Sequence, residues 1–174
     1  MTDRPHQFAL DEVLQRDVHI PALDERLGQW LRPVSIATAL GDFELDRSLG
    51  WFSGRVRSGS VDVAASLAID DGSIEGSETC RAALARLVEL VGELPEADAR
   101  WRAFAASKLT DLAGDWQQDD EDPTSVEPIT TRAFTQRIRL DDLTIAADGS
   151  VTSYYDDGDL FWGHAIIVEV AMDG

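Results

Sequence analysis

The fold of this chain is decided by the stretch WFSGRVRSGSVDVAASLAI, residues 51–69. Apolar residues alternate with small or polar ones on both sides of a Ser-Gly pair at 58–59, a pair that favours a tight turn. Alternation with a period of two indicates strands with one buried face. With the strand that contains Phe43, this stretch predicts a three-stranded antiparallel meander over about residues 42–70.

Helical periodicity follows this meander. Apolar residues recur at helical spacing through residues 77–91, where Ser77 is placed to cap the first turn, and again from Pro95 to Trp116. A short third helix is expected over residues 130–139 with Thr130 as its cap. The side chains assigned to the buried face of the second helix are Trp101, Phe104, Ala105, Leu109, Leu112 and Trp116.

A second three-stranded meander closes the chain. Its strands are expected at residues 143–145, 151–156 and 161–171, with two-residue turns at the Asp-Gly pairs 148–149 and 157–158. Strands grouped on either side of helices are typical of an α+β domain with a mainly antiparallel sheet and helices on one face. Residues 36–174 are expected to form this single domain, and residues 1–35 a helical extension.

Charge is the strongest signal in the composition. The chain carries 33 acidic and 15 basic side chains, a net charge of −18, and no Lys or Arg follows Arg139. Phosphate backbones and anionic lipids repel such a surface, so neither nucleic acid nor a membrane is an expected partner, whereas a basic protein would be attracted. No secretory signal or membrane-spanning run is present, so a cytoplasmic location is expected.

The common sequence motifs of catalysis are missing. There is no glycine-rich phosphate loop, nucleophile elbow or zinc-binding His pair, and no cofactor is predicted. The single cysteine, Cys80, lies in an apolar helical stripe and is expected to be buried. One stretch, YYDDGDLFWGHAI at residues 154–166, is nevertheless dense in reactive side chains. A tight turn within it would place Asp156 opposite Asp159, which is unfavourable unless a cation or a base lies nearby.

Two interpretations of this stretch remain open. Its acidic and imidazole groups could form a metal site or a general-base site, whose residues would be Asp156, Asp157, Asp159 and His164. Alternatively, the carboxylates bind turn N–H groups while the aromatic rings pack across strands. The acidic loop after the second helix is either solvated or part of a docking surface. The residues of that surface would be Trp116, Asp119, Asp120, Glu121, Asp122, Tyr155 and Trp162.

The stretch at 154–166 also carries a family resemblance. Together with GDFELDRSLGWFSG at residues 41–54 and with residues 134–143, it resembles the bacterial domain-of-unknown-function family numbered 2262, over residues 40–174. The resemblance implies no activity, cofactor or site residue. Some similar small acidic bacterial domains are thought to be immunity proteins of toxin systems, which is an analogy and no more.

Three functions follow as hypotheses. The leading one is a non-enzymatic acidic protein-binding module that engages a basic partner. Such a module could be an immunity-type protein. The second is a metal-dependent or acid–base enzyme built on the Asp and His side chains of residues 156–164. The third is a structural accessory domain. The sequence leaves the oligomeric state open.

Overall fold

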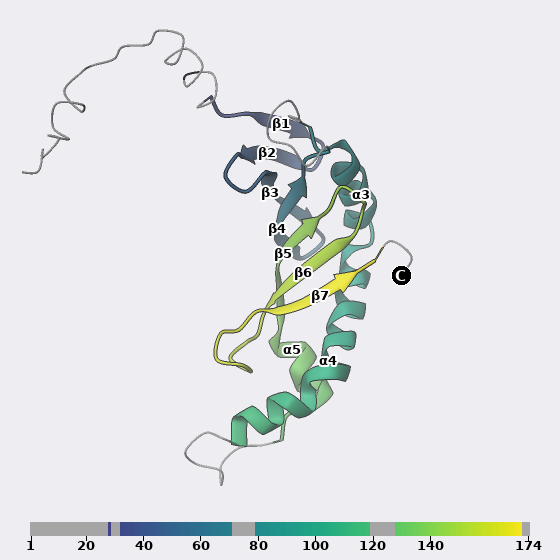
Figure 1. Cartoon of the computed structure of the whole chain (residues 1–174). Coiled ribbons are helices and arrows are strands. Elements are labelled where there is room, and N and C mark those ends of the chain that lie inside the picture. The colour runs from purple at the N-terminus through teal and green to yellow at the C-terminus, as the bar shows by residue number, and fades with distance from the viewer. Residues whose placement is uncertain (1–27, 29–31, 71–78, 119–127, 172–174) are drawn as a thin grey trace, which may run out of the picture. The chain divides into compact units, whose positions relative to one another are not determined.

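A seven-stranded sheet forms the centre of the structure. The computed structural model describes residues 28, 32–70, 79–118 and 128–171. From Val34 onward the chain forms one compact unit. Its strands follow one another across the sheet in chain order (Figure 1). They are β1 (Ser35–Thr38), β2 (Gly41–Asp46), β3 (Trp51–Ser58), β4 (Val61–Ala68), β5 (Arg139–Ile145), β6 (Val151–Asp156) and β7 (Ile166–Val170).

In the described part of the chain between β4 and β5 lie three helices: α3 (Arg81–Val91), α4 (Leu94–Gln118) and α5 (Thr131–Arg137). Helix α3 packs over β3, β4 and β5, helix α4 packs against β7, and α5 packs against α4. Figure 1 shows α3 and α4 together on one side of the sheet. Because the chain crosses this layer between β4 and β5, these two strands are parallel, whereas every other neighbouring pair is antiparallel. The predicted α+β fold is confirmed.

Both meanders differ from their predicted form. The first gains a short edge strand, β1, which pairs with β2 through a turn in which Thr38 Oγ1 donates to the carbonyl oxygen of Gly41 at 2.8 Å. The second has a shorter last strand, since β7 begins at Ile166 instead of at residue 161. A long loop, residues 157–165, therefore separates β6 from β7.

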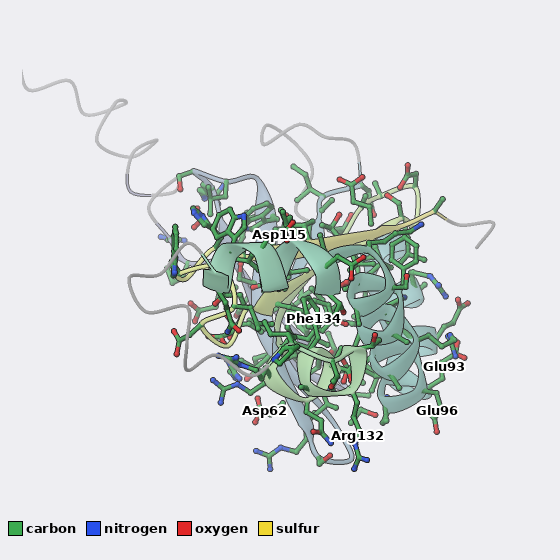
Figure 2. The ribbon with its side chains drawn as sticks, turned by 90° about the horizontal axis from the view of Figure 1, so that it is seen from below. Asp62, Glu93, Glu96, Asp115, Arg132 and Phe134 are labelled. Atoms are coloured by element: carbon green, nitrogen blue, oxygen red, sulfur yellow. The ribbon has the colours of Figure 1, made fainter. Side chains whose placement is uncertain are left out.

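The core lies between the sheet and the helices. Alternate residues of the strands face it. Phe134 of α5 is fully buried, and its label lies near the middle of Figure 2. The prediction for α4 was partly wrong, because Phe104 and Leu112 are 55% and 44% exposed. The buried face of α4 carries mostly small residues, which let a helix backbone approach its neighbours closely; these are Ala97, Ala105, Ala106 and Ala113.

The helix termini allow the predicted capping residues to be compared with the observed ones. Thr130 caps α5 as predicted, accepting a bond from Ala133 N at 3.1 Å. Ser77 lies outside the described residues, and α3 begins after Cys80, whose side chain makes no cap bond. The acceptor for this helix comes instead from Asp70, which follows β4 and binds Ala82 N at 3.1 Å. Among the described helices, none is long and apolar enough to cross a membrane.

Candidate functional site

The loop between β6 and β7 contains the side chains that the sequence singled out. The last paired residues of the two strands are Tyr155 and Ile166, so the predicted two-residue turn at Asp157-Gly158 is wrong. Asp156 and Asp159 consequently do not face one another across a hairpin. The backbone has positive φ at four loop residues, Gly158, Asp159, Trp162 and Gly163.

Asp157 organises this loop from within. Its side chain is buried, with 4% exposed. One carboxylate oxygen accepts from the backbone N of Asp159 at 3.2 Å, and the other accepts from Phe161 N at 2.7 Å and Gly163 N at 3.1 Å. A carboxylate that binds the N–H groups of several loop residues favours a wide turn over a tight hairpin, because in the hairpin those N–H groups would pair across the strands. This is the physical reason that the tight turn does not form.

The charge of Asp156 is compensated from the neighbouring strand. Arg139 lies opposite Asp156 in the β5–β6 register, with 3.6 Å between its Nη2 and the carboxylate Oδ1. The same Oδ1 accepts from Gly158 N at 3.0 Å. Arg137, at the end of α5, donates from Nε to the carbonyl oxygen of Gly158 at 3.0 Å. The acidic loop is thus anchored by two arginines that precede it in the chain.

An aromatic cluster joins the loop to α4, and Trp116 is its centre. The Trp116 ring centroid lies 5.4 Å from that of Phe161, 4.9 Å from Trp162 and 5.8 Å from His164. Phe161 is buried and also meets the ring of Phe134 at 6.2 Å. Trp162 is 65% exposed, and its φ of 55° lies in the left-handed region. The cluster therefore has a buried half and a half that is offered to solvent.

Three of the four candidate catalytic residues border one small hollow. This hollow, about 220 Å³, is lined by Asp156, Asp157 and His164 with Asp141 and Tyr154. Asp159 does not line it. Among the described residues, no three His, Cys, Asp or Glu side chains converge closely enough to hold a metal ion. With Asp157 bound to loop N–H groups and Asp156 to Arg139, the hollow brings acidic groups near each other without forming a ligand set.

Tyr155 is a core residue with a buried polar partner. Its ring is 1% exposed and its hydroxyl donates to Asp98 Oδ1 at 3.1 Å. Asp98, itself 1% exposed, also binds the guanidinium of Arg102. Burial, and then the neighbouring Asp98 carboxylate, raise the pKa of Tyr155 well above its ordinary range. Tyr155 therefore does not contribute to an exposed contact surface, and the predicted acidic loop residues Asp119, Asp120, Glu121 and Asp122 lie outside the described residues.

The sequence missed a set of exposed apolar residues beside β7. A groove of about 240 Å³ is lined by Leu109, Leu112 and Trp116 of α4 and by Ile166 and Ile167 of β7. Ile167 is 55% exposed. Two signals were available: apolar residues on two adjacent stripes of α4, and the consecutive pair Ile166-Ile167, which breaks strand alternation.

Comparison with known proteins yields a family. Residues 37–174 match the family described as "Uncharacterized protein conserved in bacteria (DUF2262)". No curated protein and no solved structure matches the chain.

Proposed function

This chain belongs to that uncharacterised bacterial family, and we propose that it is a non-enzymatic binding module that engages a basic protein partner. The observation that carries the proposal is Trp162, an indole side chain 65% exposed on a protein with a net charge of −18. Exposed tryptophan leaves a large apolar surface in water and is favoured at the centres of protein interfaces. Its left-handed backbone is costly for a bulky residue, which favours a functional reason for its presence.

The bonding of the loop carboxylates supports a binding role over a catalytic one. A general base needs a lone pair directed at its substrate, and a carboxylate has about four lone-pair positions. Asp157 uses three of its bonds on the N–H groups of its own loop. Asp156 is shared between Gly158 N and Arg139. Of the loop side chains that are exposed, the indole of Trp162 offers the largest apolar surface, and Asp159 and His164 are exposed beside it.

Charge supports a basic partner. Exposed carboxylates lie beside the aromatic and apolar residues: Asp111 and Asp115 next to Leu112 and Trp116 on α4, with Asp115 labelled in Figure 2. Complementary charge increases the rate of encounter, and the apolar centre then holds the complex. An immunity-type inhibitor, which covers a basic partner, is one form that such a module takes.

The proposal is tested by titrating the full chain with the purified products of the genes adjacent to its own, basic proteins first. We expect saturable binding that persists at about 300 mM salt, where contacts between exposed charges are largely screened. Trp162→Ala is expected to weaken it at least about tenfold. Leu49→Ala is the matched control, because Leu49 is 58% exposed in the turn between β2 and β3; it should change the affinity by less than about twofold.

Two outcomes would contradict the proposal. One is that none of these proteins binds. The other is that binding falls with salt alone and is the same for the Trp162 and Leu49 variants, because adsorption by bulk charge needs no aromatic contact.

A further inference from the structure

We propose that the outer edge of β7, which no other described strand pairs with, is where the partner docks, by adding an extended segment of its own chain to the sheet. The segment would carry apolar side chains on one face and basic side chains on the other. This inference rests on the proposed function and specifies its site and partner chemistry. It follows from three features of the described residues: the edge itself, the hollows beside it, and the charge around it.

The edge of β7 has few of the features that usually prevent strand addition, although the strand has only five residues and carries the charged Glu169. It is the last strand of the sheet, and among the described residues it pairs only with β6. In an antiparallel pair, alternate residues of an edge strand direct their N–H and C=O groups outward. Natural edges are commonly guarded by Pro, Lys or a bulge. The β7 sequence, Ile-Ile-Val-Glu-Val, has no Pro or Lys and keeps a regular register with β6.

Two hollows accompany this edge along α4. The groove of about 240 Å³ lies at its start, by Ile166 and Ile167. A larger hollow of about 470 Å³ lies at its end, where Val168 and Val170 meet Trp101 and Phe104. Alternate side chains of an added strand fall on the same face of the sheet, so every second residue of a docked segment would reach toward α4. Of the exposed apolar side chains, Phe104 lines the larger hollow, and Leu112 and Ile167 line the smaller one.

Charge selects a basic segment from another protein over a second copy of this chain. Two copies joined along β7 would bring together two surfaces of net charge −18, and like charge opposes association. Glu169 is exposed on β7 itself, and Asp111 is exposed beside Leu112. Arg86 and Arg100 line the larger hollow together with Glu93 and Glu169, whereas no Arg or Lys lines the smaller one. The basic residues of the segment therefore belong near Ile166, away from these two arginines.

The probe is a displayed library of random peptides of about ten residues, a length that spans an edge of this kind, selected on the full chain. We expect selected sequences in which apolar and basic residues alternate. The tightest peptide is then synthesised with and without methyl groups on alternate backbone nitrogens. Methyl groups on the nitrogens whose N–H groups would bond to β7 are expected to weaken binding at least about tenfold, because main-chain hydrogen bonds supply much of the affinity in strand addition.

Three variants locate the peptide. Ile167→Thr keeps a β-branched residue in the strand but removes apolar contact, and Leu112→Ala shortens the wall of the groove on α4. Each is expected to weaken binding at least about fivefold. Leu49→Ala, remote in the β2–β3 turn, should leave it unchanged.

The inference is overturned if no peptide is enriched, if methylated and unmethylated peptides bind equally, or if the Ile167 and Leu112 variants bind like the Leu49 control. It is also overturned if sedimentation shows a dimer that dissociates with Ile167→Thr, because the occupant is then a second copy. A genomic neighbour that binds with an affinity unaffected by Ile167→Thr and Leu112→Ala would contradict this site while leaving the proposed function intact.

Discussion

At the scale of single residues, Trp162 combines two unfavourable features. Its indole is mostly in water, and its backbone occupies the left-handed region. The ring of Trp162 contacts that of Trp116, with 4.9 Å between the centroids. This contact offsets part of the cost, since aromatic pairs contribute about 0.5–1.5 kcal/mol beyond their buried area. The loop holds the residue there because Asp157 binds the N–H groups on either side of it, at Phe161 and Gly163.

The backbone cost can be separated from the loss of the ring by comparing two variants. Trp162→Ala and Trp162→Gly both remove the indole, but only glycine adopts a φ near 55° without strain. We expect Trp162→Gly to be more stable than Trp162→Ala by about 1 kcal/mol in denaturant unfolding. The order should reverse at Trp51 in β3, where glycine weakens a strand. Equal stability of the two Trp162 variants would show that the conformation carries no strain.

At the scale of elements, α3 depends on β4 for its beginning. The helix has no cap bond from its own Ncap side chain, and Asp70 binds both Ala82 N and the hydroxyl of Thr79, at 3.1 and 2.6 Å. The hydrogen bond from Thr79 is the main reason that the pKa of Asp70 lies below its ordinary value. A carboxylate after one element thus fixes where the next can start.

Removing this cap gives a pH-dependent prediction. Asp70→Ala is expected to lower the free energy of unfolding by about 1 kcal/mol near neutral pH, whereas Asp70→Asn, which keeps an acceptor oxygen, should lose less. Because the pKa is lowered in the folded state, the stabilisation is present above the unfolded value and is lost as the pH falls through the lowered folded value. The difference in the free energy of unfolding between the native chain and Asp70→Ala should therefore disappear in acid, below about pH 4. A gap that is constant with pH would exclude the carboxylate as its source.

Periodicity in the sequence predicts most of these helices and strands, but it does not predict the contacts of the loops and helix surfaces between them. The strands and the Thr130 cap follow from local patterns of side chains. The loop at 157–165 does not, because an Asp-Gly pair signals a tight turn and only the fold reveals that the Asp157 carboxylate takes up the N–H groups. The sequence also does not predict that Phe104 and Leu112 are exposed. A stripe of apolar residues shows which face of a helix is directed inward, but it does not show where the sheet that covers this face ends.

The sequence singled out the loop of the candidate site but did not predict the contacts that its side chains make. The density of Asp, aromatic and His residues drew attention to residues 154–166. The partner of Asp156 was not predictable, because Arg139 becomes its neighbour through the register of β5 with β6. The edge of β7 escaped notice for a similar reason: which strand ends a sheet depends on the order of all of them.

At the scale of the whole molecule, Cys80 reports on global unfolding. It lies at the start of α3, a position that usually favours a thiolate, yet it is only 2% exposed. Burial, with a smaller contribution from Asp70, raises the pKa of its thiol to about 11. The loss of hydration therefore outweighs the favourable helix terminus.

This thiol should be unreactive while the chain is folded. We expect iodoacetamide at about pH 8 to alkylate Cys80 only as denaturant unfolds the protein. Because the folded state favours the neutral thiol, stability should fall as the pH rises through the unfolded value near 9 toward about 11. Cys80→Ala should show a smaller alkaline loss than the native chain. Rapid alkylation under native conditions would contradict the burial on which this rests.

The parallel pairing of β4 with β5 also sets the order in which the molecule can be assembled during synthesis. The strands of the first meander are made in succession and can pair as they leave the ribosome, whereas β4 meets its other neighbour only after α3, α4 and α5 have been translated. In that interval a strand bearing Val63, Ala65 and Leu67 has one unpaired side, and such nascent edges are prone to misassociation. A chaperone that recognises extended apolar segments would have its clearest target in the nascent chain at this stage, before any of the acidic C-terminal strands exists.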